Sequence, residues 1–334
     1  MIRRALLLFA LLLLGGCAQS VNRASRTTLA SLQQNAVPAD PADFEKGALK
    51  VRYRWQIPPG TILKGPLNAT LGIPSIPGRI NGHPTTLILD TGNAFPVLLD
   101  ANSASAVQMQ TIRGGALKGT GIGGNVDVLL ARYDSLGFGS HAVLGQGVGG
   151  VFLHSYCNTF AGVTLSEMQL NLLGLPFLEQ FSSLTIDAPR NEVIFAYKRP
   201  FQPPPNAASF PFTIEEGRIW IQIKVGTQTV RAFFDTGCGS GLRLTASALA
   251  SVPKSAIASP RLRKRNAMGV GGVEQEHVGV LHEATLGTLR VAPLEFDTSA
   301  ASKDVLLGWL PFRQSRMTID FEKRKVWVEA TKRE

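Results

Sequence analysis

The sequence has few of the residues on which metal-dependent and nucleophilic chemistry usually depend. Of its 334 residues only 3 are Cys and 5 are His. The histidines lack the spacing of a metal site, and their acidic and serine neighbours form no catalytic triad pattern. We therefore expect no metal and no cofactor, and structural or exposed roles for the histidines, which are His83, His141, His154, His277 and His282.

Long apolar runs are also scarce. Arg3 and Arg4 precede ten apolar residues, 5–14, a run too short to cross a bilayer as a mature helix but suited to the core of a signal peptide. The segment ends Leu-Gly-Gly-Cys at Cys17, which resembles the bacterial lipobox, whose Cys is lipidated and becomes the new N-terminus. An ordinary secretory signal with a chance Cys is the alternative.

The lipobox resemblance implies a cellular location. We expect a lipoprotein-type signal peptide at residues 1–16 and membrane attachment through a lipid on Cys17. Ala18, rather than Asp, follows this Cys, and in the Gram-negative sorting rule this favours the outer membrane. The resemblance therefore implies a protein of the bacterial cell envelope, anchored in the outer membrane and facing the periplasm.

Charge is low and mostly basic. Charged residues make up 17% of the chain, with a formal net charge of +10. A basic surface favours anionic phospholipid or other anionic partners, yet the positive residues are dispersed except at 261–265, where a solvated loop is the simpler interpretation. No nucleic-acid-binding module is visible, and we expect no nucleic acid as a partner.

Two cysteines remain besides the expected anchor, Cys157 and Cys238. An oxidising periplasm permits a bridge between them. Nothing in the sequence places the two residues near each other, so a disulfide is not favoured, but the sequence does not decide the question.

The most informative feature present is a repeated tripeptide. Asp-Thr-Gly occurs at residues 90–92 and again at 235–237, and each copy ends an apolar run. One such tripeptide arises by chance in roughly one chain in ten of this length, and two in well under one in a hundred. Two carboxylates, Asp90 and Asp235, therefore have the same local setting.

The residues around each tripeptide repeat as well. Both copies follow a sequence typical of a β-hairpin, with the turn Asn81-Gly82 before the first and Gly226 before the second. Both precede a Gly-x-Gly-Gly stretch, then apolar-apolar-Gly at Gly174 and Gly308 followed by Pro-Phe, then a closing strand. Four landmarks recur in one order, so the chain is a duplicated module.

This order of landmarks resembles the retropepsin-like aspartic peptidases over roughly residues 60–330. Retroviral enzymes pair two identical chains, whereas this sequence resembles pepsin-like enzymes in carrying both halves. The resemblance implies an all-β fold of two homologous retropepsin-like (acid protease) β-barrel lobes with a cleft between them and few short helices. It also implies a monomer with internal pseudo-two-fold symmetry.

The expected domain boundaries follow from the landmarks. Residues 17–59 hold the lipidated N-terminus, a tether that lifts the body off the membrane, and a flanking strand at Lys50–Ile57. Lobe 1 occupies residues 60–199, a Pro-rich linker residues 200–205, and lobe 2 residues 206–330. We expect an insertion in lobe 1 at 145–162, and short helices near 101–107, near 246–251 and after each Pro-Phe.

Elementary chemistry explains the two acids. Two carboxyls within hydrogen-bond reach cannot both ionise cheaply, so they share one proton and act as base and acid. Asp90 and Asp235 are therefore the candidate catalytic residues, which hold a water and activate it for attack on a peptide carbonyl.

The resemblance implies roles for the neighbouring residues. In the family each Thr hydroxyl binds the backbone of the opposite loop and each Gly lets that backbone approach the carboxylates. The implied positioning residues are Thr91, Gly92, Thr236 and Gly237. The Gly-x-Gly-Gly stretches match flaps that close over substrate, at Gly121, Ile122, Gly123, Gly124, Gly269, Val270, Gly271 and Gly272.

Two positions depart from the family pattern, in which Ser, Thr or Ala usually follows the tripeptide. Here Asn93 and Cys238 stand there. Asn93 can still donate a hydrogen bond to a carboxylate, whereas a thiol does so weakly. Cys238 is alternatively a small buried hydrophobic residue.

Three functions from different classes remain open. The favoured one is an aspartic endopeptidase that cuts extended polypeptide between the lobes. The second is a non-catalytic envelope lipoprotein that binds peptide or protein with the same cleft. The third is an architectural lipoprotein, which leaves the repeated Asp unexplained because a buried unpaired carboxylate is costly.

Overall fold

The computed structural model describes residues 18–41, 44–45, 48–49, 53–69, 72–121, 124–139, 141–160, 163–258, 262–269, 272–298 and 303–329. Most of these residues are in strands, and the helices are short, which confirms the all-β class. The signal segment and Cys17 lie outside the described residues.

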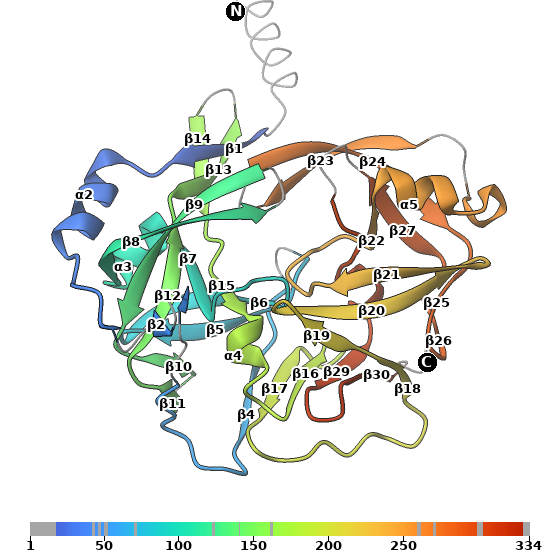
Figure 1. The fold of residues 1–334 in the computed structure, drawn as a ribbon, viewed down its shortest axis with the longest axis horizontal. Helices are drawn as coiled ribbons and strands as arrows, with labels where there is room; N and C mark the ends of the chain where they lie inside the picture. Colours follow the sequence, from blue (N-terminus) through green and yellow to red (C-terminus); the bar gives the residue numbers. More distant parts are fainter. Residues whose placement is uncertain are drawn as a thin grey trace, which may run out of the picture.

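A nine-stranded sheet contains the first Asp-Thr-Gly. It forms the left part of the molecule in Figure 1. From edge to edge its strands are β11 (His141–Leu144), β10 (Leu136–Phe138), β5 (Ser75–Ile80), β6 (His83–Asp90), β15 (Leu172–Gly174), β7 (Val97–Asp100), β12 (Gly147–Phe152), β9 (Gly124–Tyr133) and β8 (Gln110–Gly121).

A ten-stranded sheet contains the second Asp-Thr-Gly and lies on the right in Figure 1. Its main path is β26 (Leu289–Arg290), β25 (Ala284–Leu286), β20 (Arg218–Val225), β21 (Gln228–Phe234), β28 (Leu306–Leu307), β22 (Leu242–Leu244), β27 (Leu294–Thr298), β24 (Gly272–Leu281) and β23 (Arg263–Gly269); β19 (Thr213–Glu215) pairs with β20. Nine strands thus repeat the order of the first sheet, strand for strand.

A six-stranded sheet joins the two parts of the chain. Its order is β18 (Ala208–Pro211), β30 (Lys325–Glu329), β29 (Arg316–Asp320), β16 (Ser183–Asp187), β17 (Glu192–Ala196) and β4 (Ile62–Pro66). The central pair β16 and β29 runs antiparallel, with Thr185 opposite Thr318 and their hydroxyls 2.8 Å apart. Reciprocal pairing of this kind is what a two-fold relation between the two parts requires.

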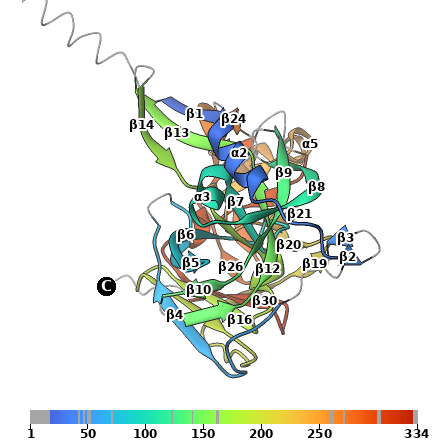
Figure 2. The ribbon, with the colours of Figure 1, turned by 90° about the vertical axis from the view of Figure 1, so that its left-hand side faces the viewer.

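The N-terminal residues do not form the expected tether. Residues 18–23 form β1 (Ala18–Arg23), which pairs with β13 (His154–Phe160) of the hairpin that β14 (Val163–Met168) completes. Helix α2 (Arg26–Gln34) then packs on the body through buried Leu32, whose carbonyl accepts a bond from Thr111 Oγ1. Figure 2 shows β1, β13 and β14 together at one end of the molecule.

Two further expectations need correction. The described part of Lys50–Ile57 is not a strand: Trp55 forms a single bridge to Leu144, and the flanking strand is β4 instead. The insertion overlaps the expected range 145–162 only in part: β12 has a counterpart in β27, and the additional hairpin is β13 and β14, at 154–168. A short two-stranded ribbon, β2 (Phe44–Glu45) and β3 (Ala48–Leu49), lies outside these sheets.

Four helical elements lie close to where the sequence predicts them: α3 (Ala101–Ala106), α5 (Ala246–Ser251), α4 (Leu175–Leu178) and the 3-10 turn η3 (Leu310–Phe312). Helix α2 and the 3-10 turn η2 (Lys254–Ala256) are not predicted. The sequence predicts a helical turn after each Pro-Phe pair. Instead, the pair lies within the turn, in α4 of the first repeat and in η3 of the second. Asp100 and Thr245 cap α3 and α5 by accepting backbone N–H bonds.

Candidate active site

Two hairpins deliver the repeated acids to one place. Strand β6 ends at Asp90, and Asp235 directly follows β21. The turn Asn81-Gly82 has positive φ at both residues, 51° and 78°, which matches the twist of a tight hairpin. The sheet order places β6 and β21 at equivalent positions, so the two acids end equivalent strands.

Each carboxylate is bound by its own loop and touched by the opposite one. Gly92 N–H donates to Asp90 Oδ1 and Gly237 N–H to Asp235 Oδ1, both at 2.9 Å. A Cβ on Gly92 would lie 2.6 Å from Asp235 Cγ, and one on Gly237 would meet the Asp90 carboxyl more closely still. The two Asp-Thr-Gly loops are therefore in contact, and only glycine fits at either position.

The threonines exchange hydrogen bonds across the pair of loops. Thr91 Oγ1 donates to Phe234 O at 2.8 Å, and Thr236 Oγ1 donates to Leu89 O at 2.6 Å. Each hydroxyl also accepts the backbone N–H of the other threonine, at 3.0 and 3.1 Å. Both side chains are fully buried, so these four bonds fix the two loops relative to each other.

A strand passes behind each loop. Gly174 N–H donates to Pro96 O and Leu175 N–H to Asn93 O in the first repeat. Trp309 N–H donates to Cys238 O in the second, and Gly308 lies against the carbonyl oxygens of Cys238 and Ser240. These contacts support the two Asp-Thr-Gly loops, and Gly174 and Gly308 contribute no chemistry of their own.

The electrostatics of the two acids are coupled. Burial raises the pKa of Asp90 well above its usual range, and the charge of Asp235 and a hydrogen bond with it raise this pKa further. Burial also raises the pKa of Asp235, while the bond from Asp90, the N–H groups of Gly237 and Gly92, and the charge of Arg243 lower it. Two buried carboxyls whose pKa values are both raised and coupled favour one proton shared by the pair.

The side chains of the residues that follow the tripeptides do not bind the carboxylates, although the backbone N–H of Asn93 lowers the pKa of Asp90. The Asn93 amide does not reach a carboxylate through its side chain: it donates to Phe95 O at 3.0 Å and accepts Phe95 N–H. Cys238 is a free, buried thiol beside Ser240, and burial raises its pKa to about 11. It is therefore a small packing residue rather than a nucleophile.

The two Gly-x-Gly-Gly stretches are the turns of equivalent hairpins. Gly121 pairs with Gly124 at the end of β8 and β9, and Gly269 pairs with Gly272 at the end of β23 and β24. The tips themselves, Ile122, Gly123, Val270 and Gly271, lie outside the described residues. The hairpins are present, and the position of their tips over the acids stays a prediction.

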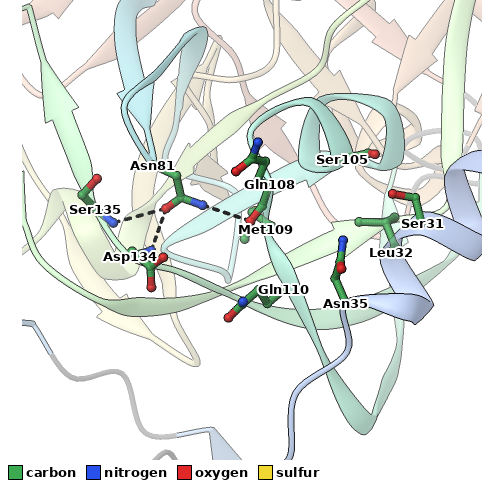
Figure 3. Close-up of a pocket in the computed structure, with 10 residues that line it drawn as sticks. All are labelled: Ser31, Leu32, Asn35, Asn81, Ser105, Gln108, Met109, Gln110, Asp134 and Ser135. Carbon is green, nitrogen blue, oxygen red and sulfur yellow. Dashed lines mark hydrogen bonds between the residues drawn. The ribbon is translucent and has the colours of Figure 1, made fainter.

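A polar cavity of about 650 Å³ lies elsewhere, between α2, α3 and the turn after β5 (Figure 3). Asn81 bridges its wall, donating to Val107 O and accepting from Asp134 N–H and Ser135 N–H. Asn81 thus joins the β5–β6 turn to the end of α3 and to the turn after β9.

The described part of the chain contains neither a group of potential metal ligands nor a helix that could cross a membrane. No group of three or more His, Cys, Asp or Glu side chains there is arranged to hold a metal ion. Among the same residues, no helix is long and apolar enough to span a bilayer.

A cluster of charged side chains beside the second acid is not predicted from the sequence. Arg243 is buried among Asp297, Glu274 and Glu276, and Arg265 extends the cluster. The expected solvated loop at 261–265 is in its described part a strand, in which Arg265 is paired rather than free. The available signal was the alternation Glu274, Glu276 in the second hairpin, where the first has Val126, Val128.

Comparison with known proteins supports this site. Residues 76–177 match the model of a family described as aspartyl protease. The match runs from β5 to α4 and includes Asp90, Thr91 and Gly92. It supports an aspartyl protease family and, in general, a hydrolase of the aspartic protease type. No curated protein matches the chain.

Proposed function

We propose that the protein is an aspartic endopeptidase whose two acids, Asp90 and Asp235, jointly activate a water molecule. The observation that carries the proposal is the reciprocal arrangement of the two tripeptides, in which each glycine lies against the opposite carboxyl. The four threonine hydrogen bonds support it, because they hold the acids at one spacing. The family match supports the same chemistry for the first acid.

The proposed reaction uses the single proton that the pair shares. In the starting state one carboxyl of the pair is protonated and the other is ionised. The ionised carboxylate takes a proton from the bound water as the water oxygen attacks the peptide carbonyl carbon. The protonated carboxyl gives its proton to the carbonyl oxygen, which becomes the hydroxyl of a tetrahedral diol. As the diol collapses, one of its hydroxyls gives a proton to the ionised carboxylate, the C–N bond breaks, and the amine leaves with the proton of the other carboxyl.

The supporting residues take separate roles in the proposal. Thr91 and Thr236 fix the loops, and Gly92 and Gly237 allow their close approach. The hairpins that turn at Gly121–Gly124 and Gly269–Gly272 act as flaps that exclude water and bind the substrate backbone. A monomer with two homologous lobes and an inter-lobe cleft is the architecture we propose, supported by the repeated strand order.

The test of the proposal is cleavage of an unfolded protein at mildly acidic pH. Asp90→Asn and Asp235→Asn should each lower turnover by about a hundredfold or more, because a shared proton needs both carboxyls. A statine-type peptide, whose hydroxyl mimics the tetrahedral diol, should inhibit the wild type. Glu192→Gln, which changes an exposed ion pair with Lys64, is the control.

Two results would separate the alternatives. Near-normal turnover by either Asn variant would exclude the shared-proton mechanism. Binding of the statine peptide without any cleavage would favour the second function, a non-catalytic envelope protein that binds peptide with the same cleft.

We also propose that the protein is attached to the bacterial outer membrane by a lipid on Cys17. The support is the Leu-Gly-Gly-Cys sequence after a short apolar run. Cys17→Ser should leave the signal peptide uncleaved or release the protein from the membrane fraction, since the acyl chains supply the anchor. Mass spectrometry that finds an unmodified mature N-terminus at another residue would contradict the anchor and leave the peptidase proposal untouched.

A further inference from the structure

The strand registers align the two repeats residue by residue. In the first repeat, Leu172 of β15 is paired with both Ile88 and Leu98, and Leu98 is paired with Gly150. In the second repeat, Leu306 of β28 is paired with Phe233 and Arg243, and Arg243 with Asp297. The same pairing path therefore makes Arg243 the counterpart of Leu98 and Asp297 the counterpart of Gly150.

The flap hairpins extend the alignment. Gly150 is paired with Leu130, and Asp297 with Val278. Leu130 of β9 and Val278 of β24 are therefore equivalent. Two residues earlier in each strand Val128 is the counterpart of Glu276, and four residues earlier Val126 is the counterpart of Glu274. Four equivalent positions thus carry apolar residues or glycine in one repeat and charged residues in the other.

In the first repeat three of these positions, Leu98, Val126 and Val128, belong to an apolar cluster beside Asp90, and Gly150 borders it. The cluster is separate from the main core and contains Ile88, Leu98, Val126, Val128, Phe152, Leu170 and Leu172. Ile88 lies two residues before Asp90 on the same strand face. Half-buried Phe95 and Ile73 pack against the cluster, so its surface continues to the partly exposed edge of the Asp90 loop.

In the second repeat the same region is a network of charges. Arg243 donates from Nε to Asp297 Oδ1 and from Nη1 to Glu274 Oε1, both at 2.7 Å, and from Nη2 to Glu276 Oε1. Arg265 donates to Glu276 Oε2 at 3.1 Å and to Glu295 Oε1 at 2.6 Å. The network lies close to the second acid, since the charge of Arg243 acts on both Asp235 and Cys238.

The carboxylates of this network outnumber its guanidinium groups. Two arginines, Arg243 and Arg265, face four acids: Glu274, Glu276, Glu295 and Asp297. The third arginine, Arg263, is 3.9 Å from Glu295 with its side chain 76% exposed, so water screens its contribution. Asp297 Oδ2 is buried with no hydrogen-bond partner among the described residues, and Arg265 Nη2 lies 3.6 Å away. The described part of the network is therefore predominantly acidic, and Asp297 Oδ2 has acceptor capacity left.

We propose that the two sides of the catalytic pair select different substrate side chains. The apolar cluster beside Asp90 accepts an apolar side chain, and the acidic network beside Asp235 accepts a basic one, Lys or Arg. The specificity-determining residues are Glu274, Glu276, Glu295 and Asp297, with Arg243 as the residue that positions them. This inference rests on the proposed peptidase function, because it names the substrate class of that same site.

Energetics favours a role beyond stability. Buried ion pairs cost desolvation that their attraction barely repays, and well-packed apolar residues of similar volume are often as stable or more so. The first repeat provides such an apolar solution at the same four positions. The charged alternative in the second repeat therefore suggests selection by charge, since complementary charge gives specificity more than affinity.

The decisive variant copies the first repeat into the second. Arg243→Leu, Glu274→Val, Glu276→Val and Asp297→Gly are made together, so that no buried charge loses only one partner. Arg265 keeps Glu295. If this variant does not fold, Glu274→Gln with Glu295→Gln removes two charges at side chains that are 12% and 26% exposed and leaves the buried Arg243–Asp297 pair intact. Glu192→Gln is the matched exposed control.

The readouts are cleavage and binding. A cleavage-site profile on a denatured proteome should show Lys or Arg enriched on one side of the scissile bond and apolar residues on the other. Two statine-type peptides are then compared that are identical except for Arg or Leu at the position where the profile shows basic residues enriched. Their affinities for the wild type should differ by about tenfold or more. The fourfold variant should lose this difference and prefer apolar residues on both sides.

The outcomes separate this inference from the proposed function. Equal affinity of the wild type for the two peptides, or an unchanged Arg preference in the fourfold variant, would overturn the charge selection. An Arg preference in binding with no cleavage of any protein would leave the selection standing and contradict the peptidase function instead.

Discussion

At the scale of single residues, the close approach of the two glycines to the opposite carboxyls is the most constrained feature. Gly92→Ala would place a Cβ 2.6 Å from Asp235 Cγ, and neither loop can withdraw because the threonine bonds hold both. We expect Gly92→Ala and Gly237→Ala each to abolish peptide cleavage and to cost about 1–3 kcal/mol of stability.

A control for this prediction is present in the same chain. Gly65 in β4 has ordinary strand geometry and open space where a Cβ would lie. Gly65→Ala should keep full activity and an unchanged Tm. Activity retained by Gly92→Ala would mean that the two loops are further apart than the structure shows.

The raised pKa of Asp90 predicts how stability depends on pH. A carboxyl whose pKa is raised by folding stabilises the protein fully below its unfolded pKa of about 3.9, and this contribution is lost as pH rises through the folded value. Because Asn cannot ionise, Asp90→Asn avoids that loss. The Tm of Asp90→Asn minus that of the wild type should therefore increase by a few degrees between pH 3 and pH 7.

Calorimetry across this pH range measures the difference directly. A Tm difference that stays constant from pH 3 to pH 7 would show that burial does not disfavour the ionised form of Asp90. Glu192→Gln, at an exposed ion pair, should show no such trend.

At the scale of elements, the N-terminal helix α2 buries one side chain, Leu32, in the body. Leu32 is 2% exposed and belongs to the main core, while its neighbour Gln33 is exposed. Leu32→Ala should therefore cost about 2–5 kcal/mol of unfolding free energy, as for other buried leucines. Gln33→Ala should change it little. Equal Tm values for the two variants would mean that α2 does not pack on the body.

The same helix shows what the sequence does not reveal. The hairpins before each acid are predictable because Asn81-Gly82 and Gly226 are strong turn signals between apolar strands. Helix α2 has only Leu29 and Leu32 on its inner face, too few for a recognisable period, and its position depends on distant partners such as Thr111.

The candidate site also has one part that the sequence predicts and another that it does not. Both acids and their threonines follow from a repeated local motif. The charged network does not, because Arg243, Glu276 and Asp297 are far apart in sequence and meet only through the strand registers. The bounds of the insertion are only partly predictable for a related reason: glycine-rich β12 resembles a loop, but it pairs with β7 and β9, and the additional hairpin starts after it at His154.

At the scale of the whole molecule, the two parts of the chain are joined by far more than their connection. Strands β16 and β29 pair over five residues, and the threonines exchange four further bonds. The connection at 201–206 has no regular secondary structure. Two co-expressed chains, divided between Pro203 and Pro204, should therefore assemble one to one and cleave protein.

Size-exclusion chromatography and the cleavage assay test this prediction together. Neither chain alone should be active, because each supplies one acid. Assembly of an Asp90→Asn first chain with an intact second chain should give an inactive complex of the same size. Separate elution of the two chains as folded monomers would contradict the joint role of the central sheet.

Strand β1 begins at Ala18, the residue after the proposed lipid attachment site, and it contacts β24 of the second flap hairpin as well as pairing with β13. If Cys17 carries the lipid as proposed, a single peptide bond joins the anchor to β1, and the end of the molecule that contains β1 and β24 would face the bilayer. An enzyme attached in this way would contact polypeptide that emerges from the membrane or lies along it. It would rarely contact polypeptide that diffuses in the surrounding compartment. A flexible spacer of about twenty residues inserted between Cys17 and Ala18 would lengthen its reach by roughly 25 Å and turn a surface-bound enzyme into one that samples the surrounding compartment.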